Sequence, residues 1–292
     1  MAQKRRHIFR YLLLLALIIV AAICFWLLVS HGSVPNEHTL AQHPNRLTVL
    51  TWNTHQMGQF KKADQNEVLQ YLSSQDADII CLQEVDVYKT DEFLTLPEVK
   101  EVLGRKYAYS YLDFSVYNKR RQFGNMVWSK YPLVNKHTVE YEIRSNLSSR
   151  CDVVVNTTDT LRLIVNHLES NRIDQNDTTA ESIGRKWGKA GLRRHAQAQV
   201  VRHEIDRSPH PVIVVGDFND IALSPTYYII SRGLHDVWLE TSWFGWGATC
   251  EKWGVGLRID YILCSKSLLP VDCQVVPTTG SDHKPLVATL AW

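Results

Sequence analysis

The sequence of 292 residues lacks an excess of charge of either sign. Its 32 lysines and arginines nearly balance its 30 aspartates and glutamates, which leaves a formal net charge of only +2. The overall charge therefore gives no reason to expect a polyanionic partner, and any such partner must be recognised locally.

Regularly spaced cysteines are also absent. Of the six cysteines, Cys24 lies in an apolar run and the other five show no tight spacing, so neither a disulfide framework nor a zinc pattern is present. Thiolate clusters and close histidine pairs, which zinc would need, are missing as well. Cys81 and Cys264 lie in apolar, strand-like runs, where a buried free thiol is the default. The sequence leaves one disulfide possible between two of Cys151, Cys250 and Cys273.

One long uncharged run does occur, "YLLLLALIIVAAICFWLLVS" at residues 11–30. Twenty residues of helix span about 30 Å, the thickness of a bilayer's hydrocarbon core. A cleaved signal peptide has a shorter apolar region and small residues before the cut, so an uncleaved transmembrane signal anchor is favoured. The basic flank at residues 1–10 should stay in the cytoplasm, which makes the chain a single-pass membrane protein with an extracytoplasmic catalytic domain.

No linker, low-complexity segment or clear repeat interrupts residues 46–292, so one domain is expected after a short polar tether at 31–45. Many strand-length runs with few helices, and no strict alternation of the two, favour an α+β or layered sandwich fold over a Rossmann sheet. One helix is expected at 64–75, with Asp64 as a cap. Another is expected at 191–207, with Leu192, Ala196 and Val200 on its apolar stripe.

Several strand-like runs end in polar side chains. In "VIVVGDFND", Asp217 and Asn219 are two residues apart and can face one site together. Such side chains supply the oxygen ligands that Mg²⁺ and Mn²⁺ prefer, and histidines beside carboxylates can transfer protons. Each position alone is more readily explained as a turn or a solvated side chain, but the repetition predicts a shared site. Other runs end with Asn53 and His55, with Gln83 and Glu84, and with Asn166, His167 and Glu169. Arg258 and Asp260 stand at the start of a strand-like run, and Asp282 and His283 stand just before the last one.

The segments "TWN", "CLQE", "NHLES", "GDFN", "RIDYI" and "SDHKP", in this order, resemble the endonuclease/exonuclease/phosphatase superfamily over about residues 46–292. The resemblance implies an α/β (α+β) fold, a four-layer αββα sandwich of two mostly antiparallel sheets with the active site at one edge. It also implies Mg²⁺-dependent hydrolysis of phosphate esters by attack of water at phosphorus, with Mn²⁺ as the alternative ion.

The resemblance further implies roles for single residues. Glu84 would be the principal metal ligand, with Asn53 and Asp282 nearby. Asp217 and Asn219 would orient or deprotonate the attacking water. His283, with its tautomer fixed by Asp260, and His167 would contact the phosphate. His55 stands where several nucleases of the family carry an acidic residue, and its place inside or outside the site is open.

Basic and aromatic segments bear on the substrate. Residues 117–125 and 184–194 mix both kinds of side chain, and residues 243–256 hold three tryptophans and four glycines. Solvated loops, or packing for the last segment, are the plainer explanation. The positions expected to touch substrate are His55, Arg121, Asn125 and Trp253.

The substrate expected is a nucleic acid, or else a phospholipid or another phosphorylated small molecule. The alternative activity is that of a sphingomyelinase-like phospholipid or inositol-phosphate phosphoesterase. A catalytically inactive binding module of the same fold is disfavoured, because the eight motif positions from Asn53 to His283 are intact. The membrane is expected as a partner through the N-terminal helix, and no protein partner can be inferred.

Overall fold

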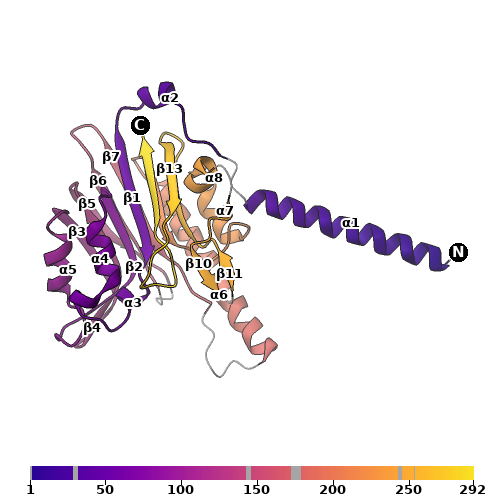
Figure 1. Cartoon of the computed structure of the whole chain (residues 1–292), viewed down its shortest axis with the longest axis horizontal. Helices are drawn as coiled ribbons and strands as arrows, with labels where there is room; N and C mark the ends of the chain where they lie inside the picture. The colour runs from indigo at the N-terminus through magenta and orange to yellow at the C-terminus, as the bar shows by residue number, and fades with distance from the viewer. Residues whose placement is uncertain (1, 29–31, 143–145, 172–178, 243–244, 253) are drawn as a thin grey trace.

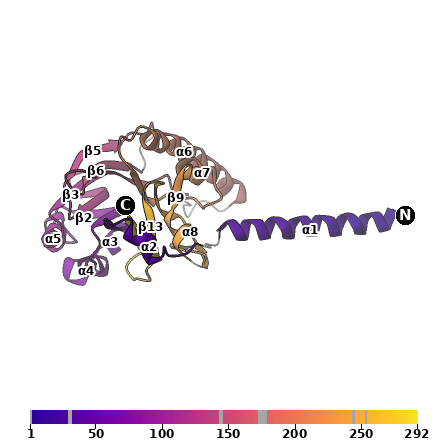
Figure 2. The ribbon, with the colours of Figure 1, turned by 90° about the horizontal axis from the view of Figure 1, so that it is seen from above.

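The computed structural model describes residues 2–28, 32–142, 146–171, 179–242, 245–252 and 254–292. Two six-stranded sheets pack face to face, and helices cover their outer faces (Figure 1). Seen from above, α4 and α5 lie outside one sheet and α6 and α7 outside the other (Figure 2). The α/β sandwich expected from the sequence is therefore confirmed.

The first sheet has the order β13-β14-β1-β2-β4-β3. Its strands are β13 (Leu269–Val275), β14 (Leu286–Ala291), β1 (Arg46–Asn53), β2 (Ile79–Tyr88), β4 (Arg121–Ser129) and β3 (Tyr109–Tyr117). The second sheet has the order β5-β6-β7-β8-β12-β9. Its strands are β5 (Leu133–Val139), β6 (Ser148–Val154), β7 (Thr160–His167), β8 (Val212–Asp217), β12 (Asp260–Ser265) and β9 (Leu234–Asp236). β10 (Cys250–Lys252) and β11 (Val255–Leu257) form a separate ribbon.

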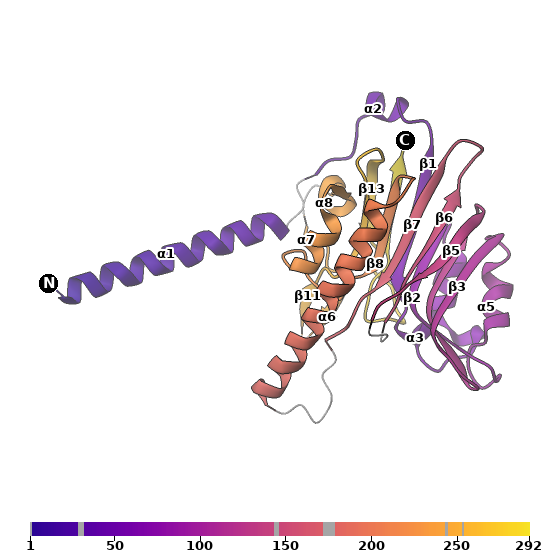
Figure 3. The same cartoon turned by 180° about the vertical axis from the view of Figure 1, so that it is seen from behind.

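Both sheets are mixed, which refines the expectation of mostly antiparallel sheets. β1 pairs in parallel with β2, and β7 pairs in parallel with β8, whereas the other neighbours run antiparallel. Parallel neighbours need a long crossover connection, and helices supply it in both sheets. Between β1 and β2 lie α3 (His55–Gly58), η1 (Ala63–Gln65) and α4 (Glu67–Ser74). Between β7 and β8 lies α6 (Ala180–Asp206), which runs across the second sheet and projects beyond it (Figure 3).

Three further helices of the sandwich are short. They are α5 (Leu96–Leu103), α7 (Pro225–Ser231) and α8 (Val237–Thr241). α5 begins with a capping box, in which the side chains of Thr95 and Glu98 each accept a hydrogen bond from the other residue's backbone.

Side chains alternate between two cores along each central strand. On β1, Leu47 and Val49 face the other sheet, whereas Leu50 and Trp52 face the outer helices. On β8, Ile213 and Val215 lie between the sheets. This period of two is the geometry of a strand, and it sets which residues at the strand ends continue the row between the sheets.

The two expected helices are present, but their details differ. α4 is capped by Asn66, whose side chain accepts from the amide of Leu69, and not by Asp64. α6 begins at Ala180 and buries a different face, since Leu192 is 75% exposed. The buried face carries Arg194 and Arg202, whose guanidinium groups donate hydrogen bonds to Asp220, Asp206 and backbone carbonyls. A search for a stripe of apolar residues does not find a face that buries hydrogen-bonded arginines.

The N-terminal helix α1 (Ala2–Leu28) extends away from the sheets (Figure 1). Within the described residues, no helix combines the length and apolar character needed to cross a membrane. The span expected at residues 11–30 is therefore not supported, and residues 29–30 lie outside the described part. Because the helix begins at Ala2, the expected basic flank and the apolar run form one continuous element.

The region expected as a tether, residues 31–45, contains one short helix, α2 (Glu37–Ala41), capped by Asn36. The amides of Gly32 and Ser33 bond to carbonyls of α8 and its C-cap. All six cysteines are free, so the disulfide left open by the sequence does not form, and the buried thiols expected at Cys81 and Cys264 are confirmed.

Candidate active site

Four polar residues continue the row of side chains between the sheets at one edge. Asn53 ends β1, His167 ends β7, Asp217 ends β8 and Asp260 begins β12. Each is at most 3% exposed. Asp217 and Asp260 are register partners on neighbouring strands, and so are His167 and Asp217. The apolar core thus passes directly into a polar cluster at this edge.

Glu84 joins the cluster through an irregularity in β2. Before it, Ile80 and Leu82 face the outer helices, and after it Val85 and Val87 do so. The pairing of β2 with β4 shifts between Leu82 and Val85, and Glu84 has a positive φ of 52°. Glu84 is therefore the extra residue of a β-bulge, a feature that re-aims a side chain.

The Glu84 carboxylate lies between a histidine and an amide. Its Oε1 is 3.4 Å from Nε2 of His167 and accepts a hydrogen bond of 3.1 Å from Nδ2 of Asn53. Burial alone would raise the pKa of Glu84, but His167, Asn53 and His283 outweigh it and lower the pKa to about 2. The carboxylate is therefore ionised at neutral pH and 23% exposed, which leaves it open to a ligand.

Asp217 is held by two carboxamides. Its Oδ2 accepts from Nδ2 of Asn53 at 3.0 Å and from Nδ2 of Asn219 at 3.1 Å, while its Oδ1 accepts from the Asn219 amide at 2.7 Å. Burial raises the pKa of Asp217, and the charge of Asp260 raises it further, against a partial lowering by His283, His167 and Asn53. Phe218, between the two polar residues, points to the other face of the sheet and is fully buried against the outer helices.

Gly216 explains how β8 reaches this position. Its φ is +113°, and a Cβ at this residue would lie 2.1 Å from the carbonyl oxygen of Asn166. Only glycine permits that approach and that backbone conformation, so β8 can lie this close to β7 only with glycine at this position.

His283 and Asp260 form a buried pair. Nδ1 of His283 is 2.8 Å from Oδ2 of Asp260, and its Nε2 lies 3.9 Å from Oδ2 of Asp217. Burial would lower the pKa of His283, but the two carboxylates outweigh it and raise the pKa well above its usual range. Trp52 donates its indole N–H to the His283 carbonyl at 2.9 Å and so anchors the loop on β1.

Asp282 and His55 meet at the rim of the cluster. His55 Nδ1 is 3.2 Å from Oδ1 of Asp282, and both side chains are about 40% exposed. The hydrogen bond to Asp282 is the largest cause that raises the pKa of His55. His55 begins a left-handed turn in which Gln56 and Met57 also have positive φ, a backbone strain of the kind that clusters at functional sites. His55 therefore lies at the site and not outside it.

The oxygen ligands suit a hard divalent cation. The side chains of Glu84 and Asn53 are hydrogen-bonded to each other. The backbone amide of His55 donates to Oδ1 of Asn53, and the His55 ring contacts Asp282, so His55 connects Asp282 to the other two residues. Oδ1 of Asp260 is buried and accepts no hydrogen bond from the described residues. In the same part of the chain, two clusters place three potential ligand atoms within 4.8 Å of one another, and both contain His283. They are Asp217, Asp260 and His283, and Cys250, Asp282 and His283.

Of the remaining expected positions, Asn125 lies opposite the bulge at Glu84, whereas Arg121 lies farther along β4. Arg121 binds Asp86 at 2.7 Å on the sheet edge beyond Glu84. Asn125 is 1% exposed, and its Nδ2 lies 3.3 Å from acceptors of Leu147, Ser149 and Val165, so it links the two sheets. Trp253 falls outside the described residues.

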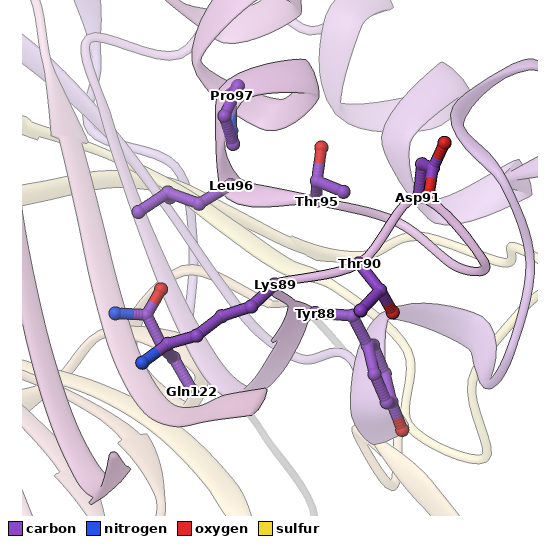
Figure 4. Close-up of a pocket in the computed structure, with 8 residues that line it drawn as sticks. All are labelled: Tyr88, Lys89, Thr90, Asp91, Thr95, Leu96, Pro97 and Gln122. Carbon is purple, nitrogen blue, oxygen red and sulfur yellow. The ribbon is translucent and has the colours of Figure 1, made fainter. Parts of the chain in front are cut away.

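A surface pocket of about 630 Å³ lies beyond Arg121, lined by residues 88–91 and 95–97 and by Gln122 (Figure 4). It contains none of the polar strand-end residues, so the clustered polar residues and not this pocket mark the candidate active site.

Two contacts of the site were not expected from the sequence. The Asn146 side chain is 3.2 Å from Nε2 of His167 and donates to the Leu168 carbonyl at 2.7 Å, which fixes the end of β7. Cys250 pairs with His283 in an isolated β-bridge. Asn146 and Cys250 are far in sequence from His167 and His283, and neither of them follows a strand-like run as the expected site residues do.

Comparisons with known proteins agree with this geometry. A family model described as the Endonuclease/Exonuclease/phosphatase family matches residues 50–283. No curated protein matched the chain.

Solved structures show the same fold. The endonuclease/exonuclease/phosphatase from Beutenbergia cavernae is 18% identical with a TM-score of 0.59, over 84% of this chain and 71% of that one. A 3′ phosphatase from Neisseria bound to a product DNA hairpin is 18% identical with a TM-score of 0.60, over 84% and 100%. Sphingomyelinase C from Streptomyces griseocarneus is 16% identical with a TM-score of 0.55, over 84% and 99%.

Proposed function

The chain belongs to the endonuclease/exonuclease/phosphatase family of phosphate ester hydrolases, and we propose that it hydrolyses phosphodiester bonds with Mg²⁺ bound at Glu84. The observation that carries the proposal is the meeting of an ionised Glu84, the carboxamides of Asn53 and Asn219, and the Asp217–His283–Asp260 group at one sheet edge.

Glu84 and Asn53 would hold the metal ion, with Asp282 at the rim. Mg²⁺ is proposed because the ligands are oxygens, which hard cations prefer, and Mn²⁺ is the alternative. When bound, the ion supplies charge neutralisation and Lewis acidity at the phosphate. The bulge that turns Glu84 into the site is the feature of the fold that makes this ligand available.

Asp217 would orient the attacking water and accept its proton. A general base is most effective when its pKa lies close to the working pH, and burial together with Asp260 raises the pKa of Asp217 in that direction. Asn53 and Asn219 both donate to Oδ2, so the carboxylate is held in a single orientation.

His283 would donate a hydrogen bond to a phosphate oxygen as negative charge develops there. Asp260 binds Nδ1 and so leaves Nε2 to face Asp217 and the substrate. Asp260 and Asp217 raise the pKa of His283, which favours a proton on the nitrogen that would donate to the phosphate. His167, fixed by Asn146 and Glu84, would supply a second donor on the other side.

The site is tested with the full chain and Mg²⁺, assayed against DNA, RNA, sphingomyelin and phosphoinositides. Asp217→Ala and His283→Ala should each lower kcat by about 10²–10⁴-fold, the usual worth of a general acid or base. Asp76→Ala, with a side chain that is 90% exposed, and the exposed His203→Ala are the matched controls. Full activity in Asp217→Ala or His283→Ala would refute the assigned mechanism.

A row of basic residues on α6 supports nucleic acid as the substrate. Arg185 and Lys189 are exposed, and Arg193 follows at the same four-residue spacing, so the three share one face of the helix. Arg193 binds Glu169 at 2.9 Å, two residues from His167. The row therefore leads outward from the site and offers a path for successive backbone phosphates.

The second candidate is a phospholipid phosphodiester, which is favoured by the likeness to Streptomyces sphingomyelinase C. The double variant Arg185→Ala/Lys189→Ala separates the two. If nucleic acid is the substrate, its affinity should fall and the salt dependence of binding should become shallower by about 0.7 for each lost phosphate contact on a single strand. Arg105→Ala, at a side chain that is 72% exposed in the turn after α5, is the control.

A further inference from the structure

Cys250, Asp282 and His283 form a mixed cluster of metal ligands that the proposed hydrolysis does not explain. The Cys250 thiol, a carboxylate oxygen of Asp282 and a ring nitrogen of His283 lie within 4.8 Å of one another. Cys250 begins β10, whereas Asp282 and His283 precede β14. The proposed reaction has no role for a thiol.

The backbone holds these residues together. Cys250 and His283 form an antiparallel β-bridge, and the amide of Lys284 donates to the carbonyl of Thr249 at 2.6 Å. Cys250 is 2% exposed and His283 4% exposed. Two of the ligands are thus fixed by secondary structure and packing, the arrangement that a preformed metal site requires.

His55 brings a fourth ligand. Its Nδ1 is 3.2 Å from Oδ1 of Asp282, and both side chains lie at the exposed rim. A thiol, a carboxylate and two imidazoles are a donor set that suits Zn²⁺, whereas Mg²⁺ disfavours sulfur and nitrogen. The sequence offered no zinc pattern because these four residues meet only in the fold.

We propose that Cys250, Asp282 and His283, together with His55, bind a thiophilic divalent cation of the Zn²⁺ type, and that this cation inhibits hydrolysis. Ligand atoms around a tetrahedral zinc lie roughly 3.5 Å apart, given metal–ligand bonds of about 2.0–2.3 Å. The ligand atoms of Cys250, Asp282 and His283, which lie within 4.8 Å of one another, need only a small contraction to reach that spacing, and the His55 ring would have to move toward them. Asp282 and His55 sit at the rim, where side chains can make this adjustment and admit the ion from solvent.

The inhibitory part of the proposal rests on the proposed function and follows from the position of His283. A cation on Nε2 would occupy the nitrogen that faces Asp217 and the phosphate. A cation on Nδ1 would displace the hydrogen bond to Asp260. In both cases His283 no longer donates to the phosphate, and Asp282 is withdrawn from the rim of the Mg²⁺ site.

Binding is tested without any substrate, by titrating the full chain with Co²⁺ as a spectroscopic substitute for Zn²⁺. A bound thiolate gives an intense ligand-to-metal absorption band in the near ultraviolet. Among the described residues no other cysteine lies in a metal-ligand cluster, so the band in the wild type reports on Cys250. We expect the band in the wild type, its displacement by Zn²⁺, and its loss in Cys250→Ser and Cys250→Ala.

Cys273→Ser is the matched control, because Cys273 is equally buried and lies in neither cluster. Its Co²⁺ band should equal that of the wild type. A wild type without the band, or a Cys250→Ser protein that keeps it, would overturn the site. Because absorbance requires no turnover, these results stand even if no tested phosphate ester is hydrolysed.

Inhibition is tested by adding Zn²⁺ to the Mg²⁺-supported reaction, with each variant compared with its own zinc-free rate. Loss of a ligand should raise the Zn²⁺ concentration for half-inhibition by at least about 10-fold in Cys250→Ser, and not in Cys273→Ser. Equal sensitivity of Cys250→Ser and the wild type would show that inhibition arises elsewhere.

Discussion

At Glu84 one additional residue in β2 reverses which side chains face the helices and which face the other sheet. A regular strand would place this carboxylate among the apolar residues that cover the outer face. The bulge instead brings it to Asn53 and His167, whose contacts keep it ionised with a pKa of about 2. The metal ligand therefore depends on a backbone irregularity as much as on the residue type.

Replacing Glu84 by glutamine keeps the shape and removes the charge. We expect kcat/KM to fall at least about 100-fold and the affinity for Mn²⁺ to fall with it, because the amide is a weaker ligand for a hard cation. Calorimetric titration with Mn²⁺ measures the second effect directly. Glu101→Gln, at a side chain that is 72% exposed, should change neither quantity. If Glu84→Gln kept its affinity for Mn²⁺, Glu84 would not be a metal ligand.

A second carboxylate links charge to stability. Asp152 on β6 is 1% exposed and binds Nε of Arg162 at 2.5 Å and Nδ2 of Asn135 at 2.8 Å. Burial raises the pKa of Asp152, but the bonds from Arg162 and Asn135 outweigh it, and the net shift is downward. A folded pKa below the unfolded value of about 3.9 stabilises the fold above that pH, and the contribution is lost as the pH falls through the folded pKa.

Asp152→Asn should therefore be most destabilised, relative to the wild type, at neutral pH. The difference in the free energy of unfolding should shrink below about pH 4, where the wild-type carboxylate also loses its charge. Urea denaturation at a series of pH values measures both. A difference that is the same at pH 3 and pH 7 would show that the pair contributes through packing alone.

On the scale of elements, β8 depends on a single glycine beside the site. Alanine at Gly216 would need a φ of +113° and would meet the Asn166 carbonyl at 2.1 Å. We expect Gly216→Ala to lower the free energy of unfolding by about 1–3 kcal/mol. It should also reduce kcat, because Asp217 would move with the strand end. Thermal denaturation and kinetics on the same sample measure both effects.

Gly184→Ala is the matched comparison, since it lies within α6 and a Cβ there meets nothing within 4 Å. Alanine is the better helix former by about 1 kcal/mol, so this variant should be slightly more stable than the wild type and fully active. A Gly216→Ala protein as stable as Gly184→Ala would refute the close approach at β8.

Much of the element structure could be predicted because it rests on local patterns. The runs that end in Asn53 and Asp217, and the run that begins with Asp260, alternate or are wholly apolar, and these polar residues do share one edge. The bulge at Glu84 could not be predicted from residue types, because it depends on the pairing of β2 with β4.

The buried face of α6 was missed for another reason. Arg194 is buried because Asp220 and the carbonyl of Glu169 bind its guanidinium group, and Arg202 is buried against the carbonyl of Ile230. These partners are more than 20 residues away in sequence and give no local signal. The same holds for Asn125, which fills its place by bonding across the two sheets, and for the contact between Cys250 and His283.

On the scale of the whole molecule, the site is divided between the two sheets. Asn53 and Glu84 come from the first, and His167, Asp217 and Asp260 from the second. The core between the sheets therefore controls the distances across the site. The cellular location of this domain, on the far side of a membrane, stays a prediction from the sequence.

Leu163→Ala tests the role of the core between the sheets. Leu163 is fully buried between them on β7, and Leu72, on α4, is fully buried on the outer side of the first sheet. Each truncation to alanine should cost about 2–5 kcal/mol of stability. Measured well below both unfolding temperatures, kcat should fall in Leu163→Ala and not in Leu72→Ala. Equal rates would mean that each sheet holds its half of the site independently.

The position of β14 also determines when the fold can be completed during synthesis. This strand, Leu286–Ala291, lies between β13 and β1. Its residue Ala291 pairs with Arg46, the first residue of β1, although the two are far apart in sequence. A nascent chain that has not yet released these residues from the ribosome has an open edge on β1 and lacks the anchor for His283. The pairing of β14 with β1, and with it the position of the loop that carries His283, can therefore form only after residues 286–291 have left the ribosome.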